Sequence, residues 1–418
     1  MLRYFILLFI VILNNCKSVL AQCGARYDSV LFPVTKYADI QYGANYDNKN
    51  QLTHLLLDVY TPDPNADTER KRPLIIFTHG GSFVGGDRQD QHIDSTAHYF
   101  ASLGYVTANI EYRVEQTVFI SPFVNFADPN NFYKAILRGA HDVKAAIRFF
   151  KKDVIQQANT YGIDTSKIFL YGSSAGAIIS LHAVFLDDTL EMNNTYKTNI
   201  AALGGLEGNS GNSGYSSKGV KAIVGCSGAV GSTGWLTNNT DIAYLGFHNS
   251  IDLTVPYDIG CFITVACFIG QFYGSKQIYQ KAHSLGMNCK LVTVNGYGHP
   301  VDEYDKTASY LMIRNETRKF LKNMVCPTVS GIMQREIVSL KIFPNPSIGI
   351  FYLDLPAELR NKSVNISIYN ALGQQVWYEQ NNTNAVLELQ TTLPKGNYFI
   401  RIDKGTNDKI YTATVVID

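Results

Sequence analysis

The chain has 418 residues, more than one ordinary domain needs, so its length leaves room for a second folded unit. Hydrophobic residues make up 46% of it, which is typical of a globular protein, and 36 Lys and Arg against 35 Asp and Glu leave a net charge of +1. This balance argues against nucleic acid or an anionic surface as a partner. The sequence has no glycine-rich phosphate loop, Cys-x-x-Cys pair or histidine-rich cluster, so we expect neither a cofactor nor a metal ion.

The N-terminus has the features of a signal peptide. Arg3 supplies a positive charge, residues 4–13 form an apolar run too short to span a bilayer, and residues 18–21 offer small side chains for cleavage before Gln22. We therefore predict a signal peptide over residues 1–21 and no transmembrane segment in the mature chain. The cleavage point itself stays open, because the segment before it is longer than usual.

Strand-like and helical patterns then alternate along the chain. Apolar or β-branched runs predict strands, and longer runs at 134–150 and 307–322 predict helices. The predicted strands are 53–60, 74–78, 106–111, 168–171, 220–225, 242–248 and 289–294. This alternation predicts an α/β fold with a mostly parallel sheet and helices on both of its faces.

A serine motif directly follows the strand at 168–171. Residues 172–176 read Gly-Ser-Ser-Ala-Gly, and a run of small and apolar residues that favours a helix comes next. A tight strand-to-helix turn of this kind exposes the hydroxyl of its central residue, and the glycines allow the strand and helix to approach each other. Ser174 is therefore the candidate nucleophile.

Backbone donors for a developing negative charge are expected upstream. The strand at 74–78 leads into His79-Gly80-Gly81-Ser82-Phe83, where the glycines let the backbone come close to a reacting carbonyl oxygen. We predict an oxyanion hole formed by the amides of Gly80 and Gly81, together with the N–H of Ala175 just after the serine.

The acid and the base should follow the serine, in the order Asp then His. His299 is the last histidine of the chain and lies on a loop after a β-branched strand, and Asp252 lies on a loop just after the strand at 242–248. The carboxylate of Asp252 would orient the imidazole and stabilise its charged form. Weaker acids are Asp241 and Asp258, and the competing histidines, which we interpret as structural, are His248 and His283.

These motifs together resemble the α/β-hydrolase superfamily, on the side of the carboxylesterases and the acetyl-xylan/feruloyl esterase-like enzymes. The resemblance rests on residues 79–83, 172–176, Asp252 with the following Val255-Pro256, and the helical run 142–150. It implies an α/β-hydrolase catalytic domain over residues 22–326. The chain departs from the common His-Gly-Gly-Gly run at its third glycine, where Ser82 stands.

The resemblance implies a secreted carboxylic ester hydrolase that works through Ser174, His299, Asp252 and an acyl-enzyme. Its substrate would be a small or polysaccharide-linked ester. Two alternatives remain at this point: a serine peptidase of the prolyl-oligopeptidase type, and a catalytically silent binding protein on the same fold. The first would need a propeller-sized N-terminal region that the sequence lacks, and the filled triad positions argue against the second.

The pattern changes near the C-terminus, where helical periodicity ends and short strands predict a small antiparallel β-sandwich. The expected strands are 340–343, 350–353, 364–369, 376–379, 386–389, 397–402 and 410–416. Residues 343–346, 370–374 and 393–400 resemble the type IX secretion system sorting domain, which implies a linker at 327–337 and a sorting domain at 338–418. The secretion machinery would be its partner, with export through the periplasm to the cell surface or beyond. A carbohydrate-binding or adhesive sandwich is the alternative.

Six of the seven cysteines lie after the predicted signal peptide. An even number in an exported chain suggests disulfide bonds, and Cys261 with Cys267 is the preferred local pair. The apolar run 259–272 around this pair is expected to be a buried segment beside the acid loop or a part of the acyl pocket. The segment 114–131 is a candidate cap or an ordinary surface excursion.

Overall fold

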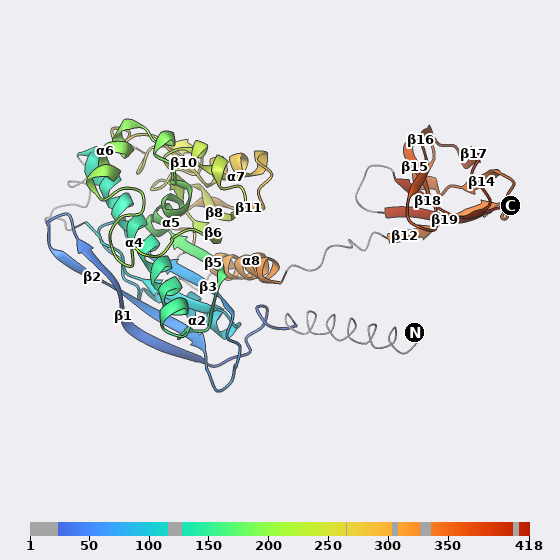
Figure 1. Ribbon diagram of the computed structural model, residues 1–418. Coiled ribbons are helices and arrows are strands. Elements are labelled where there is room, and N and C mark those ends of the chain that lie inside the picture. The colour runs from blue at the N-terminus through green and yellow to red at the C-terminus, as the bar shows by residue number, and fades with distance from the viewer. Residues whose placement is uncertain (1–23, 116–127, 265, 303–307, 327–335, 404–408) are drawn as a thin grey trace. The chain divides into compact units, whose positions relative to one another are not determined.

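The computed structural model describes residues 24–115, 128–264, 266–302, 308–326, 336–403 and 409–418 (Figure 1). The chain divides into two compact units, Met1–Pro327 and Thr328–Asp418. The predicted signal peptide, most of the predicted linker and most of the candidate cap lie outside the described residues, so these predictions stay open.

A single large sheet organises the first unit. Its strands follow the order β1-β2-β4-β3-β5-β6-β8-β11. The bounds are β1 Val34–Tyr46, β2 Leu52–Pro62, β3 Arg72–Thr78, β4 Val106–Ile110, β5 Ile163–Ser173, β6 Val220–Cys226, β8 Ala243–Ile251 and β11 Cys289–Tyr297. Neighbours from β4 to β11 are parallel, whereas β2 is antiparallel to both β1 and β4. The predicted mostly parallel sheet is confirmed, with β1 as an additional edge strand.

Helices cover both faces of this sheet, as predicted (Figure 1). Their bounds are α2 Gln91–Ser102, α4 Pro129–Gln156, α5 Ala175–Phe185, α6 Asn194–Ala202, α7 Ser275–Ser284 and α8 Ala308–Val325. Side chains of α2 and α8, such as Phe100 and Leu321, join one apolar core. Those of α4 and α5, such as Phe150 and Ile179, join the core on the other face. The α/β-hydrolase fold is thus built from two apolar layers around one sheet.

The parallel strands bring separate loops to one edge of the sheet. β5, β8 and β11 run in the same direction, and the loops after them carry Ser174, Asp252 and His299. The carboxyl edge of a parallel sheet is where ligands bind in open α/β folds. A small sheet of β7 Ala229–Val230, β10 Phe272–Gly274 and β9 Ile259–Gly260 lies in the segments between β6 and α7.

The second unit is a β-sandwich. A five-stranded sheet has the order β12-β19-β18-β15-β16, and a three-stranded sheet has the order β13-β14-β17. The bounds are β12 Glu336–Ser339, β13 Lys341–Phe343, β14 Ile350–Asp354, β15 Ser363–Tyr369, β16 Gln375–Asn382, β17 Val386–Gln390, β18 Gly396–Asp403 and β19 Lys409–Ile417. Pairing is antiparallel except between β12 and β19, and buried side chains such as Phe351 and Ile400 form a core of this unit alone.

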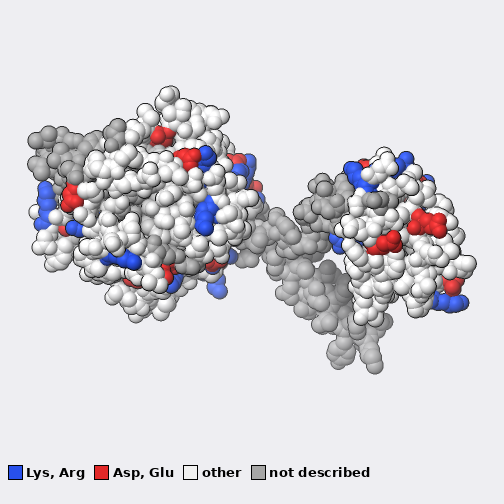
Figure 2. Space-filling view, turned by 90° about the horizontal axis from the view of Figure 1, so that it is seen from above, with Lys and Arg blue, Asp and Glu red and all other residues white. Residues whose placement is uncertain are grey.

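Charged side chains are sparse on the face that Figure 2 presents. In the face that Figure 2 presents, Lys and Arg are interspersed with Asp and Glu, and no continuous patch of one sign appears. Among the described residues, no helix has both the length and the apolar character that crossing a membrane requires.

Candidate active site

Ser174 occupies a sharp turn between β5 and α5. Its backbone has φ 49° and ψ −116°, a conformation that residues other than glycine rarely adopt. The turn is held because the N–H of Ser174 donates to the carbonyl of Cys226 at the end of β6, over 2.8 Å. Strain of this kind persists only where the surroundings hold it, and here it presents the hydroxyl at the edge of the sheet.

The two glycines of the serine motif have a steric reason. A Cβ on Gly176 would lie 2.1 Å from the carbonyl oxygen of Thr78 in β3, and one on Gly172 would lie 2.4 Å from the carbonyl oxygen of Gly176. Both distances are much shorter than any contact between a carbonyl oxygen and a carbon atom that is not bonded to it. The close packing of β5, α5 and β3 around the serine therefore requires glycine at both positions.

Three of the predicted residues meet in one hydrogen-bonded chain. Ser174 Oγ lies 2.7 Å from His299 Nε2, and His299 Nδ1 lies 2.7 Å from Asp252 Oδ2. Because a carboxylate only accepts, Nδ1 carries the proton and Nε2 is left to accept from the serine hydroxyl. Ser174 and Asp252 are only 7% and 8% exposed. The arrangement has the geometry of a nucleophile, its base and an orienting acid.

Asp252 is held by more than His299. Its Oδ1 accepts the N–H groups of Thr254 (2.8 Å) and Val255 (2.9 Å), and its Oδ2 lies 3.3 Å from His248 Nε2. Burial alone would raise the pKa of this carboxyl, but the hydrogen bonds from His248 and His299 hold that pKa well below its usual range. The carboxyl is therefore ionised wherever the chain is folded near neutral pH.

His248 was interpreted from the sequence as structural, and its contacts show that it supports Asp252. The ring is fully buried, with Nδ1 2.8 Å from Ser275 Oγ and Nε2 facing both Asp252 and the carbonyl of Val255 at 3.2 Å. Two acceptors at Nε2 require a proton there. His248 therefore donates toward the carboxylate that orients His299.

The competing acids and the other histidine lie elsewhere. Asp258 pairs with Lys276 and with Gln277 at the start of α7, and the hydrogen bond from Lys276 lowers its pKa. Asp241 forms an exposed ion pair with Lys221, 3.2 Å away. His283 is exposed on α7, where its ring lies beside that of Tyr279. None of the three contacts Ser174 or His299.

The predicted oxyanion residues surround the serine. A Cβ placed on Gly80 would lie 3.4 Å from Cβ of Ser174, so the two backbones are in near contact. The carbonyl of Gly81 accepts from Val84 and Gly85 within its own loop, which turns that carbonyl into the loop. Within the described part of the chain, no hydrogen bond engages the N–H groups of Gly80, Gly81 or Ala175. Ala175 is buried, Gly80 is half-buried and Gly81 is exposed. These amides beside Ser174 are the candidate donors to an anion.

Side chains that the sequence did not single out hold the loops after β3 and after β11 in place. Tyr112 donates its hydroxyl to the carbonyls of His79 (3.2 Å) and Gly80 (3.3 Å), and its ring stacks on His79. Asp302, three residues after His299 and 1% exposed, accepts from Ser173 Oγ at 2.7 Å and from the Tyr171 hydroxyl at 3.0 Å. The only sequence signal for Asp302 was its nearness to the candidate base.

An apolar pocket opens beside the serine. It has a volume of about 150 Å³, and the segment predicted as buried or as part of the pocket supplies five of its lining residues. The lining residues are Ser82, Phe83, Phe132, Ser174, Ala175, Ile178, Thr254, Val255, Phe262, Ile263, Ala266, Phe268 and Ile269. Among the described residues, no group of three His, Cys, Asp or Glu side chains could hold a metal ion.

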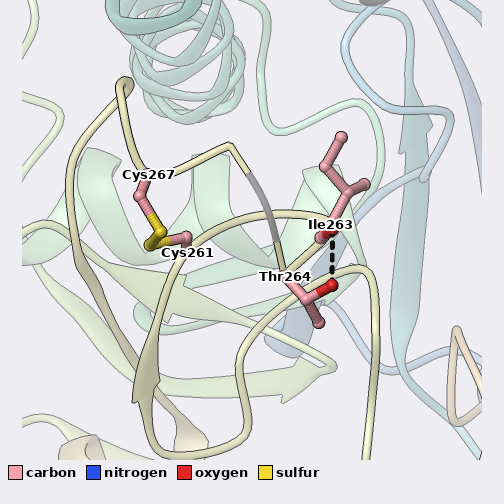
Figure 3. The surroundings of a disulfide bond; sticks show 4 residues. All are labelled: Cys261, Ile263, Thr264 and Cys267. Atoms are coloured by element: carbon pink, nitrogen blue, oxygen red, sulfur yellow. Dashed lines mark hydrogen bonds between the residues drawn. A yellow bond between two sulfur atoms is a disulfide. The ribbon is translucent and has the colours of Figure 1, made fainter.

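The cysteines follow the prediction only in part. Cys261 and Cys267 form the expected disulfide (Figure 3), and Cys326 is also disulfide-bonded. Cys226 and Cys289 are free thiols, so an even count does not mean that all six pair. Cys226 is wholly buried in β6, where its thiol contacts the Tyr171 hydroxyl, and burial raises the pKa of both thiols.

Comparison with known families assigns both units. Residues 57–245 match the BD-FAE family, an esterase-like group of α/β-hydrolases, and residues 341–418 match the secretion system C-terminal sorting domain. The chain joins a BD-FAE domain to a sorting domain. The sorting domain directs the protein by type IX secretion to the cell surface or the extracellular space.

Individual relatives resemble part of this chain. The neuroligin-like protein glit-1 of Caenorhabditis elegans is 28% identical over 123 residues, and gut esterase 1 of Caenorhabditis briggsae is 29% identical over 134 residues. These stretches cover 29% and 32% of this chain but only 15% and 21% of those relatives. The solved structure of Thermogutta terrifontis esterase 2, phosphonylated by cyclosarin, is 19% identical with a TM-score of 0.47, covering 72% of this chain and 97% of that one.

Proposed function

We propose that this protein is a secreted serine esterase that hydrolyses carboxylic esters through an acyl-enzyme on Ser174. The observation that carries the proposal is the hydrogen-bonded chain of Ser174, His299 and Asp252, with both links at 2.7 Å, at the mouth of an apolar pocket. The match to the esterase-like BD-FAE family supports the same reaction class. The ester would be a small molecule or would be attached to a polysaccharide outside the cell.

Acylation follows from the positions of the donors and acceptors. His299 Nε2 takes the hydroxyl proton of Ser174 as Oγ bonds to the ester carbonyl carbon, and Asp252 stabilises the imidazolium through Nδ1–H. The carbonyl oxygen becomes an anion, which the N–H groups of Gly80, Gly81 and Ala175 would bind. The bond to the alcohol oxygen then breaks, and that oxygen receives the proton from His299.

Deacylation repeats these chemical steps with water in place of the alcohol. His299 takes a proton from water as the water oxygen bonds to the acyl carbon, and the same backbone donors bind the second oxyanion. The acyl carbon then separates from Ser174 Oγ, which regains its proton from His299. The carboxylic acid leaves, and the free enzyme is restored without a cofactor.

The first experiment measures kcat/KM for p-nitrophenyl acetate and butyrate with the natural chain and with Ser174→Ala. Loss of a triad nucleophile should reduce turnover by at least about 10³-fold, because only backbone donors and binding remain. A fluorophosphonate should label the natural chain on the peptide that contains Ser174. Labelling of another serine, or turnover retained by Ser174→Ala, would refute the assignment.

Two controls separate the alternatives. Ser166 is an exposed serine of the same strand β5, so Ser166→Ala should change turnover by no more than about twofold. Peptide p-nitroanilides with proline before the scissile bond test the peptidase alternative, and we expect no turnover of them. A chain that hydrolyses neither substrate class and resists the fluorophosphonate would be the silent binding protein.

A further inference from the structure

The apolar pocket has a chemistry that limits what can enter it. Among its described lining side chains none is charged, and those with a polar atom are Ser82, Ser174 and Thr254. A charged group placed inside would lose its hydration without finding a counter-charge, which is strongly unfavourable. Neutral apolar groups, in contrast, gain from leaving water. The pocket therefore selects by polarity before it selects by shape.

Its floor is rigid. Phe132 of α4 packs against Phe83 from the oxyanion loop with ring centroids 5.3 Å apart, and against Phe262 at 4.8 Å. Phe262 in turn lies 4.5 Å from Phe272 of β10. Interlocked aromatic rings resist displacement, because each would have to leave a close-packed position. A group that reaches these rings would have to displace them in order to extend further.

The opposite wall is a short loop closed on itself. The described residues of this loop are 261–264 and 266–269, and Figure 3 shows the Cys261–Cys267 disulfide that closes it. Between the two cysteines, Ile263 and Thr264 have φ angles of 47° and 57°. The N–H of Ile263 donates to the carbonyl of Thr254 over 2.8 Å, so the loop is tied directly to the loop of the catalytic acid. A hydrogen bond therefore connects this wall of the pocket directly to the loop that carries Asp252.

We infer that this pocket binds the acyl half of the ester, and that it takes a neutral apolar acyl group of about the volume of a benzene ring. This inference rests on the esterase function proposed above. The size follows from the volume of about 150 Å³, because a dry cavity of about this volume, lined by Leu, Ile and Phe, holds benzene. Butanoyl, hexanoyl and benzoyl groups are neutral and small enough to fit. A dodecanoyl group is too long, and a succinyl group carries a charge.

The acyl half is favoured over the alcohol for a mechanical reason. Ile178, one helical turn after Ser174 on α5, lines the pocket together with the serine and the aromatic floor. A group attached to Ser174 can remain there during the lifetime of the acyl-enzyme. An alcohol must depart before water attacks, and an alcohol seated on that floor would have to pass the acylated serine to leave.

The test compares kcat/KM for p-nitrophenyl acetate, butyrate, hexanoate, benzoate, dodecanoate and succinate. Each buried methylene should raise kcat/KM by about fourfold while it fits, so butyrate should exceed acetate by roughly 15-fold. Hexanoate should in turn exceed butyrate, benzoate should fall in the range of these two esters, and dodecanoate and succinate should be poor substrates. A second series holds the acyl group as acetate and varies the alcohol from methyl to benzyl, and it should change kcat/KM far less.

Two variants locate the effect in this pocket. Ala266 is 4% exposed in the wall, so Ala266→Leu should fill the space and lower hexanoate turnover at least about tenfold while acetate changes little. Phe268 is 60% exposed at the rim, so Phe268→Ala should keep the fold and raise the dodecanoate-to-hexanoate ratio. Ile155→Ala, at an exposed site of α4 outside the pocket, is the matched control and should leave every ratio unchanged.

The outcomes separate this inference from the proposed function. A flat acyl profile, dependence on the alcohol series instead, or equal loss on all esters in Ala266→Leu would overturn the acyl pocket while Ser174 still reacts with a fluorophosphonate. Absence of both fluorophosphonate labelling and acetate turnover would instead overturn the esterase. If Ala266→Leu fails to fold, the two ratios measured with Phe268→Ala decide the question.

Discussion

At the scale of single residues, the candidate site depends on contacts between positions far apart in the chain. Ser174 and His299 are separated by 125 positions, and His299 and Asp252 by 47, yet both pairs lie within hydrogen-bond distance. Motif order was enough to predict all three, because each follows a strand of the same parallel sheet. The sequence could not reveal that His248 and Asp302 support them, since that depends on how side chains turn inside the fold.

The acid assignment can be tested directly. Asp252→Asn should reduce ester turnover by about 10³–10⁴-fold, because an amide beside Nδ1 favours the wrong imidazole tautomer. Asp258→Asn is the matched control: its carboxylate contacts Lys276 and Gln277 and is half exposed, so turnover should stay within about threefold. Measured kcat/KM values that fall in the opposite order would show that the acid is misplaced.

The same carboxyl should affect stability at low pH. Hydrogen bonds from His248 and His299 outweigh burial and lower the folded-state pKa of Asp252 below the unfolded value, which is about 3.9. A lowered pKa stabilises the fold above that unfolded value, and the contribution is lost as pH falls through the folded value. The melting temperature of the natural chain should therefore drop faster below about pH 4 than that of Asp252→Asn.

Comparison of the two chains removes the other carboxyls from this measurement. Asp67, whose pKa is lowered to about 2 by hydrogen bonds from Arg26 and Arg72 despite the opposing effect of burial, is present in both. Its effect cancels in the difference between melting temperatures. A difference that stays constant from pH 6 to pH 2 would show that Asp252 gains no such stabilisation in the fold.

At the scale of elements, the loop at 261–269 combines strain with a cross-link. Left-handed backbone costs about 1–2 kcal/mol for a residue with a side chain, and Ile263 and Thr264 are both β-branched. Closing so short a loop by a disulfide contributes about 2 kcal/mol by restricting the unfolded chain. The two effects are of similar size, so the loop should lose this conformation when the cross-link is removed.

Replacing both cysteines, as Cys261→Ser with Cys267→Ser, should therefore disturb the pocket wall more than the triad. We expect the hexanoate-to-acetate ratio of kcat/KM to fall several-fold while Ser174 is still labelled by a fluorophosphonate. Cys289→Ser removes a free thiol outside the pocket and should leave the ratio unchanged. If the double variant keeps the natural ratio, the disulfide does not hold the wall.

The inner strands of the large sheet could be predicted from the sequence, whereas its edge strand β1 could not. The inner parallel strands are apolar runs buried on both faces, and all were predicted. β1 was missed because it is an edge strand with mostly half-exposed side chains, among which only Tyr42 is buried, so neither an apolar run nor a clean alternation marks it. The free thiols of Cys226 and Cys289 were also beyond prediction, since pairing depends on distances in the fold.

At the scale of the whole molecule, each of the two units has apolar cores of its own. The cores of the first unit draw on residues from Tyr27 to Cys326, whereas that of the second begins at Leu340. All the candidate catalytic and oxyanion residues belong to the first unit. The change from alternating strands and helices to short strands predicted this division, because each pattern can bury its apolar face only within its own layers.

A chain that ends at Pro327 should therefore fold and hydrolyse esters like the full chain. It keeps α8, whose Ile313 and Leu321 are buried against the large sheet, and it keeps Cys326, so its apolar cores and disulfide cysteines are complete. Made in an oxidising compartment, it should match the natural kcat/KM for p-nitrophenyl butyrate within about twofold. In a host with the matching secretion system it should remain in the periplasm, because it lacks the sorting domain at 341–418. Cell fractionation with the butyrate assay measures both results at once. A shortened chain that is well folded yet inactive would show that the second unit contributes to catalysis, and one that still reaches the medium would show that export does not depend on it.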